Sequence, residues 1–185
     1  MANEEWGPLA ALIGDWEGVD GMDVSFSHDR EKVWDTPFSE KVSMKPFGPV
    51  ENGRQTLYGL DYKTAMWRGD ESDPFHTELG YWLWDAATGE VLRCFVVPRG
   101  IALVAGGTTT ADATSFTMHA GESVAPYRIA ENTYLAQNAS TVRYESNITI
   151  NPDGSWSYDE VTTLRMAEIE GEFAHTDRNT LVRVS

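Results

Sequence analysis

The sequence predicts an all-β chain that folds as an up-and-down antiparallel β-barrel of about ten strands, with a short N-terminal helix. Strand-like segments recur along the chain, with turn signals between them roughly every 8–12 residues. Most successive segments are joined by short loops, which favour hairpins between neighbouring strands. Only one segment, residues 6–13, has the pattern of a helix.

The first half of the chain supplies the helix and the first predicted strands. Pro8 suits the first turn of helix 6–13, and Gly14 can end it. Gly18 and Gly21 predict a bend or bulge in the first strand. The predicted strands of this half are residues 15–29, 31–45, 55–68 and 75–85, with a turn-rich connection at 46–53 and a polar loop at 69–74.

The second half continues in the same manner. Residues 85–90 form a tight hairpin turn, Pro98 to Gly100 interrupt the next hairpin, and Asn151 to Gly154 form a strong turn. The sequence has no repeat of 20–50 residues and no linker, so residues 1–185 are expected to form one domain. The predicted strands of this half are residues 91–97, 101–105, 114–119, 134–138, 141–150, 155–166 and 176–184.

Composition bounds the class of ligand. Hydrophobic residues make up 41% of the chain, with seven each of Trp, Tyr and Phe, so the chain can build a core and the walls of a cavity for a flat apolar ligand. The formal net charge is −15, which disfavours nucleic acid and anionic membrane surfaces as partners. The sequence leaves the oligomeric state open, a homodimer included.

The single cysteine and the absence of long apolar runs limit the setting. Cys94 lies in a strand-like run and is expected to be a buried, inert thiol, so neither a disulfide framework nor a cysteine metal cluster is predicted. The N-terminal residues 1–5 lack the basic and apolar regions of a signal peptide, and no run approaches ~18 apolar residues. A cytoplasmic protein is expected.

Residues 75–85 form the most informative predicted strand. Read at a period of two, one face carries His76, Glu78, Gly80, Trp82 and Trp84. The other face is also largely apolar, so neither side of the strand is expected to lie fully in water. This pattern suits a pocket wall, and it equally suits a core strand whose polar residues lie near its mouth.

The two ends of the chain predict how the barrel closes. Trp16 opens the first strand, and Arg183 lies in the last predicted strand. Because the first and last strands of a closed barrel pair, Arg183 is expected to stack on the Trp16 indole. Such a cation–π contact is worth ~0.5–2 kcal/mol and is structural in role.

Three stretches resemble a known family. Residues 12–18 (Leu-Ile-Gly-Asp-Trp-Glu-Gly) resemble the opening G-x-W-x-G motif of the nitrobindins, calycin-like β-barrels related in shape to fatty-acid-binding proteins and lipocalins. Residues 75–82 (Phe-His-Thr-Glu-Leu-Gly-Tyr-Trp) are similar to the family's H-x-E-x-G-[YF]-W strand, the most specific part of the match. His175, followed by Leu181 and Arg183, resembles the closing strand.

The resemblance implies a ten-stranded barrel that holds ferric haem b. In the family, one histidine of the last strand binds the iron, and the chemistry is reversible NO binding and isomerisation of peroxynitrite to nitrate. By position, His175 is the implied iron ligand and His76 a second residue of the haem pocket. A neutral imidazole opposite an open coordination position suits ferric haem and a small ligand. The haem propionates are then expected at the barrel mouth, near His76, Arg99 or Arg128.

The spacing of the closing motif keeps a second function open. His175 stands six residues before Leu181 and eight before Arg183, one more in each case than the family's spacing. Because side chains alternate along a strand, this shift is expected to turn His175 to the opposite face unless a bulge corrects it. The alternative is a haem-free carrier of a fatty acid or another small hydrophobic ligand in the barrel cavity.

Enzyme chemistry without a cofactor ranks third. His76 and Glu78 share a strand face and suit an acid–base pair, and they suit a metal site shared with His175, but the spacing demands neither. The sequence contains no G-x-S-x-G, no phosphate-binding glycine loop and no H-E-x-x-H motif. His28 and His119 are expected to be solvent-exposed or turn residues.

Overall fold

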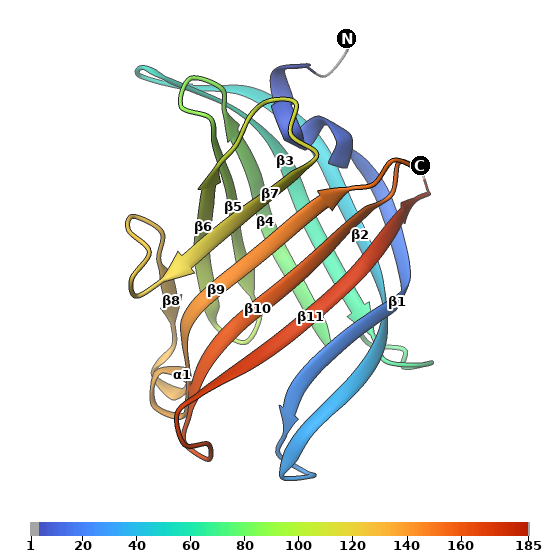
Figure 1. Ribbon diagram of the computed structural model, residues 1–185, viewed down its shortest axis with the longest axis vertical. Coiled ribbons are helices and arrows are strands. Elements are labelled where there is room, and N and C mark those ends of the chain that lie inside the picture. The colour runs from blue at the N-terminus through green and yellow to red at the C-terminus, as the bar shows by residue number, and fades with distance from the viewer. Residues whose placement is uncertain (1–3, 185) are drawn as a thin grey trace.

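The computed structural model describes residues 4–184, so Met1 to Asn3 of the N-terminal segment and Ser185 lie outside it. In this range the chain forms a closed antiparallel barrel with a short helix at one end (Figure 1). The elements are η1 (Glu4–Leu12), β1 (Gly14–Ser27), β2 (Lys32–Asn52), β3 (Gln55–Trp67), β4 (His76–Asp85), β5 (Glu90–Val97), β6 (Ile101–Thr108), β7 (Ser115–Gly121), β8 (Ile129–Glu131), α1 (Thr133–Asn138), β9 (Ala139–Ile150), β10 (Trp156–Met166) and β11 (Glu172–Arg183).

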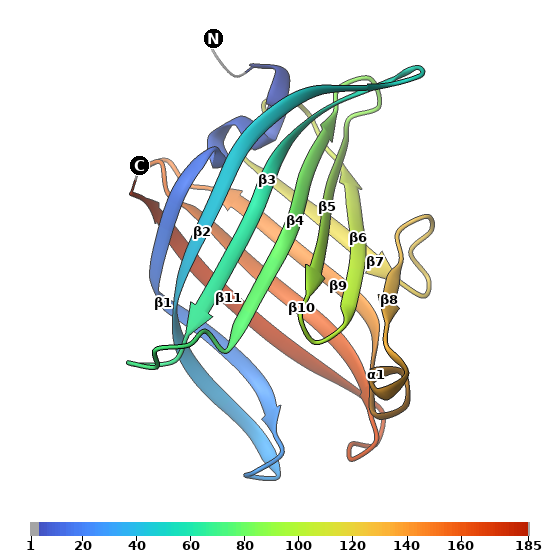
Figure 2. The same ribbon diagram turned by 180° about the vertical axis from the view of Figure 1, so that it is seen from behind.

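Ten of these strands form the barrel wall. Each pairs with its neighbour in the order β1 to β7 and then β9, β10 and β11, and β11 returns to β1. The short strand β8 pairs with the first residues of β6, whereas β6 meets β7 at the pair Gly106 and His119. Figure 2 shows β2 to β6 side by side, with β8 at the edge. The predicted ten-stranded antiparallel barrel is therefore confirmed.

The predicted N-terminal helix is present as η1, a 3-10 helix kinked at Gly7. Two local predictions were wrong. Residues 46–52 continue strand β2 across a register shift between Phe47 and Val50, so the turn begins only at Gly53. The predicted strand at 134–138 lies in helix α1, which Asn132 caps by accepting a hydrogen bond from the Leu135 amide at 3.0 Å. A capping side chain outweighed the short apolar alternation there.

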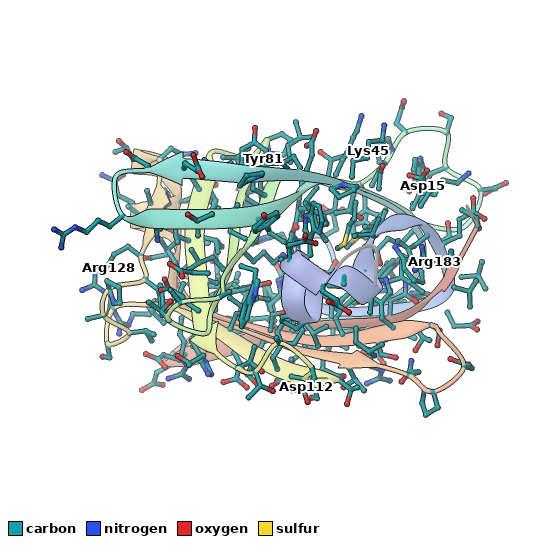
Figure 3. All side chains as sticks on the ribbon, turned by 90° about the horizontal axis from the view of Figure 1, so that it is seen from above. Asp15, Lys45, Tyr81, Asp112, Arg128 and Arg183 are labelled. Carbon is teal, nitrogen blue, oxygen red and sulfur yellow. The ribbon has the colours of Figure 1, made fainter. Side chains whose placement is uncertain are left out.

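The closing contact between the chain ends is as predicted. Trp16 pairs with Arg183 across β1 and β11, and the Arg183 guanidinium lies 4.3 Å from the centre of the indole ring. Figure 3 looks down on this end of the barrel and shows η1 lying across it beside Arg183. Leu9 and Leu12 of η1 are fully buried. This end is therefore plugged.

Indole rings fill the barrel beneath η1. Trp156 meets Trp16 and Trp82 edge to face, with ring centres 6.2 and 6.4 Å apart. All three rings are almost completely buried. The core therefore occupies the half of the barrel near η1, and space for a ligand remains at the other end. Neither helix in the described part of the chain is long and apolar enough to span a bilayer.

Candidate functional site

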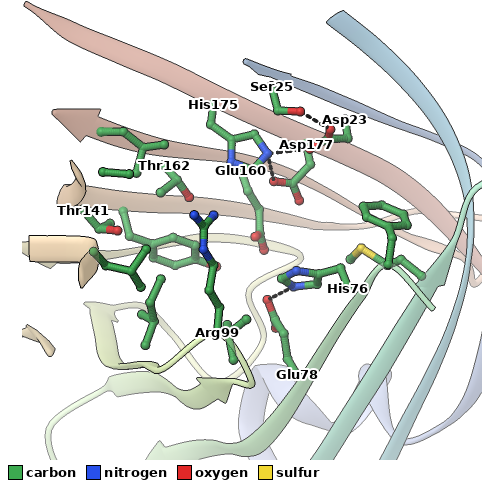
Figure 4. A pocket seen from close by; sticks show the side chains of 18 of the residues that line it. Asp23, Ser25, His76, Glu78, Arg99, Thr141, Glu160, Thr162, His175 and Asp177 are labelled. Atoms are coloured by element: carbon green, nitrogen blue, oxygen red, sulfur yellow. Dashed lines mark hydrogen bonds and ion pairs between the residues drawn. The ribbon is translucent and has the colours of Figure 1, made fainter. Parts of the chain in front are cut away.

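A cavity of about 500 Å³ opens at the end of the barrel opposite η1. Residues near the ends of eight barrel strands line it, and helix α1 contributes Leu135. The apolar lining residues include Phe26, Met66, Phe75, Phe95, Val97, Ile101, Leu103, Leu135, Leu164, Met166 and Phe173. The polar lining residues include Asp23, His76, Glu78, Arg99, Thr141, Glu160, His175 and Asp177 (Figure 4).

His175 lies on the cavity wall in strand β11. This strand begins at Glu172, four residues earlier than predicted, and pairs with β10 without a register shift from Glu172 to Leu181. Residues separated by an even number along an unbulged strand share a face. The spacing of six therefore puts His175 on the inner face with Leu181, and the expectation that His175 turns to the opposite face was wrong.

Asp23 of β1 holds the imidazole ring of His175. The Nε2 atom of His175 lies 2.5 Å from Oδ2 of Asp23, and Oδ1 of Asp23 accepts a hydrogen bond from Ser25. Burial raises the pKa of Asp23, but the hydrogen bond and charge of His175 outweigh it, so the pKa lies below its usual value. Asp23 is therefore a carboxylate that accepts the Nε2 proton. Within the described chain, Nδ1 of His175 makes no hydrogen bond.

His76 lies on another wall of the same cavity, at the start of β4 (Figure 4). Its Nε2 atom lies 3.1 Å from Oε1 of Glu78, and its side chain is 30% exposed. Leu79 and Tyr81, on the other face of β4, are about half exposed, so this face lies partly and not fully in water, as expected. Both proposed readings of the strand hold in part, because Trp82 packs in the core whereas His76 borders the cavity.

A buried arginine pairs with two carboxylates that line the cavity. Arg93 of β5 is 4% exposed and forms ion pairs with Glu78, at 2.7 Å, and with Glu160 of β10. Tyr62 and Tyr144 accept further hydrogen bonds from its guanidinium. Burial alone would raise the pKa of Glu78, but Arg93 and His76 lower it to about 2. Glu78 is therefore ionised at neutral and at mildly acidic pH.

Sequence reasoning found the two histidines and Glu78, the partner of His76, but it missed Asp23, Asp177 and Arg93. Arg93 occurs between Val91 and Phe95 on an inward face, and a charge in such a position signals a buried partner without identifying it. Asp23 and Asp177 stood in segments with no motif. Of the two other histidines, His28 borders the cavity with its side chain 59% exposed, and His119 lies in β7, not in a turn.

The single thiol has no reactive environment. Burial, with a smaller effect of the Glu90 charge, raises the pKa of Cys94 to about 11. A thiol with such a pKa is protonated at neutral pH and is a poor nucleophile. The expectation of an inert cysteine is consistent with this environment, although the side chain is only partly buried.

The His76 environment predicts a pH-dependent contribution to stability. Burial lowers the pKa of His76, but the hydrogen bond and charge of Glu78 outweigh it and raise that pKa above its usual value. A raised folded-state pKa stabilises the fold fully below the unfolded-state value of about 6.5, and this stabilisation is lost as the pH rises through the folded-state pKa. Replacing His76 with glutamine should therefore lower the unfolding free energy more at pH 5.5 than at pH 8.5.

Urea unfolding of the wild type and of His76→Gln at pH 5.5 and pH 8.5 measures this difference. His119→Gln, on the outer wall of the barrel, is the matched control. An equal loss of stability at both pH values for His76→Gln would show that Glu78 does not raise the folded-state pKa of His76.

Comparisons with known proteins agree with the fold and the motifs. The family of "THAP4-like, heme-binding beta-barrel" domains matches residues 5–183. The crystal structure of Rv2717c from M. tuberculosis is similar, with a TM-score of 0.65 and 18% sequence identity over 96% of this chain and 95% of that chain. That identity establishes a shared fold alone. No curated protein matches the chain. The family match spans nearly every described residue and confirms the resemblance of the sequence motifs, so the chain belongs to the THAP4-like haem-binding β-barrel family.

Proposed function

We propose that this barrel binds ferric haem b in its cavity, with His175 as the iron ligand, and that it binds NO and isomerises peroxynitrite to nitrate. Ferric haem with one histidine ligand supplies an open coordination position for such small molecules. The observation that carries the proposal is the placement of His175. It lies on the last strand of a barrel from a haem-binding family, and it faces a cavity with largely apolar walls.

The residues around His175 fit this role. A histidine that binds a metal through one ring nitrogen usually donates the other N–H to a carboxylate or carbonyl, which fixes the ring and raises its basicity. Asp23 accepts a hydrogen bond from the Nε2–H of His175 in this way, and Nδ1 is left for the iron. The aromatic and aliphatic lining, including Phe95 and Phe173, suits the porphyrin faces.

The cavity mouth and its second histidine supply the remaining groups. Arg99, in the turn between β5 and β6, lines the cavity and suits a haem propionate. Arg128 does not line the cavity, and its guanidinium donates to the carbonyls of Val124 and Tyr127. We therefore no longer expect Arg128 to contact a haem propionate. The raised pKa of His76 favours its cationic form, which attracts an anion such as peroxynitrite.

Titration of the apo-protein with ferric haemin tests the proposal. We expect saturating one-to-one binding with the Soret band of a histidine-ligated ferric haem. His175→Ala should lose this spectrum, whereas His119→Ala, outside the cavity, should retain it. The nitrate yield from peroxynitrite, measured with and without haem, then tests the isomerase step, and His76→Ala should lower it.

A haem-free carrier is the second candidate. The apolar walls and the Arg99 guanidinium suit a fatty acid, with its carboxylate at the mouth. Weak, non-saturating haemin binding that is indifferent to His175→Ala, together with micromolar displacement of a fluorescent fatty acid by natural lipids, would favour the carrier over the haem protein.

A further inference from the structure

Three carboxylates stand in a row across the cavity wall. Asp23 of β1 is the direct cross-strand partner of Asp177 of β11, and Asp177 is in turn the partner of Glu160 of β10. All three line the cavity. Cross-strand partners on one face have Cβ atoms about 4.5–5.5 Å apart, and like charges in such pairs destabilise a sheet. Haem binding by His175 accounts for Asp23 but gives no reason for Asp177 beside it.

Among the described residues, the outer two members of the row have hydrogen-bonded partners, whereas Asp177 has none. Glu160 pairs with Arg93, and Asp23 pairs with His175. In the described part of the chain, Asp177 accepts no hydrogen bond, and its nearest cationic group is Nε2 of His175 at 4.0 Å. Its side chain is nevertheless only 17% exposed. A largely buried carboxylate without a hydrogen-bond partner is costly unless it takes up a proton or binds a cation, and either one relieves this position.

The geometry of the cluster suits a metal ion. Asp23, His175 and Asp177 each offer one ligand atom, and these three atoms all lie within 4.8 Å of one another. Two of the residues are neighbours on the inner face of β11, and the third is opposite them on β1, so rigid strands position all three (Figure 4). Nitrogen and oxygen ligands of one transition-metal ion lie roughly 3 Å apart, because each bond is about 2.0–2.2 Å. Small side-chain rotations therefore suffice.

We propose that Asp23, His175 and Asp177 bind a divalent first-row transition-metal ion, with the remaining coordination positions open to the cavity. One imidazole and two carboxylates suit Mn²⁺, Fe²⁺, Co²⁺ or Zn²⁺ better than they suit Cu⁺, which prefers sulfur ligands. The ion replaces the Nε2 proton between His175 and Asp23, and its charge offsets the carboxylate row. The metal ion uses Nε2 of His175, whereas the proposed haem iron uses Nδ1, so the two sites are tested separately.

Titration of the apo-protein with Co²⁺, followed by its visible absorption and by calorimetry, tests the site. We expect one ion per chain and a loss of affinity of about tenfold or more in Asp177→Asn. Asp112→Asn, in an exposed loop, is the matched control and should bind as the wild type does. Absence of a one-to-one Co²⁺ complex in the wild type, or unchanged affinity in Asp177→Asn, would overturn the proposal.

Two further measurements guard against misfolding and separate this site from haem. Co²⁺ should raise the melting temperature of the wild type and of Asp112→Asn, but not that of Asp177→Asn, whose fold circular dichroism checks independently. Asp177→Asn should still take up haemin if His175 binds haem through Nδ1. His175→Ala should lose the Co²⁺ complex, and an unchanged affinity of that variant for Co²⁺ would exclude His175 from the metal site. Failure of haemin uptake alone would leave the Co²⁺ result intact.

Discussion

Replacement of Arg93 by methionine is expected to lower the free energy of unfolding by about 3–5 kcal/mol, the typical cost of removing one partner from a buried ion pair. Arg93 is 4% exposed and is the partner of two buried carboxylates, Glu78 and Glu160. Methionine keeps much of the volume but leaves Glu160 without its cation and Glu78 with His76 alone. The hydroxyls of Tyr62 and Tyr144 lose a donor at the same time.

The pH dependence of this loss identifies its cause. In Arg93→Met, protonation relieves the two carboxylates, so the stability difference from the wild type should shrink between pH 8 and pH 5. Adding Glu78→Gln and Glu160→Gln to the variant should restore part of the lost stability. Chemical denaturation measures both effects, and Arg165→Met, which removes exposed ion pairs to Glu122 and Glu172, is the control. A loss as large for Arg165 as for Arg93 would contradict the burial argument.

Replacement of Gly80 by alanine is expected to destabilise the barrel by about 3 kcal/mol, the upper end of the usual cost of overpacking. Gly80 is the glycine of the H-x-E-x-G-Y-W strand, and it pairs with Phe95 across β4 and β5. A Cβ atom at this position would lie 1.9 Å from the carbonyl oxygen of Cys94 and 2.7 Å from Cα of Phe95. Both atoms belong to the backbone, so the two strands would have to separate.

Gly106→Ala separates this backbone clash from the general effect of adding a methyl group to a strand. The three nearest atoms to a Cβ on Gly106 all belong to the side chain of Tyr127, at 2.2–2.8 Å, and that ring can turn aside. Thermal and urea unfolding should therefore show a smaller loss for Gly106→Ala than for Gly80→Ala. The reverse order would mean that the β4–β5 pair yields more easily than a tyrosine ring.

For the faces of strands, the prediction that depended on neighbouring residues was confirmed, whereas the one that depended on distant contacts failed. Alternation predicted the inner face of β4, because a strand's faces follow from its own residues. The same reasoning misplaced His175, since its face depends on the full course of β11 from Glu172. It also missed helix α1, where the Asn132 cap outweighed the apolar pattern.

The sequence by itself determined a closed antiparallel barrel, the contact of Trp16 with Arg183 at its closure, and the family to which the chain belongs. Only the tertiary structure decided which charged side chains meet the two histidines at the cavity. His175 and Asp23 are 152 residues apart, and Arg93 and Glu160 are 67 apart. Such partners meet because the register of β11 with β1 and the curvature of the barrel bring them together. No local period encodes that register, so no motif in the chain could reveal the carboxylate row beside His175.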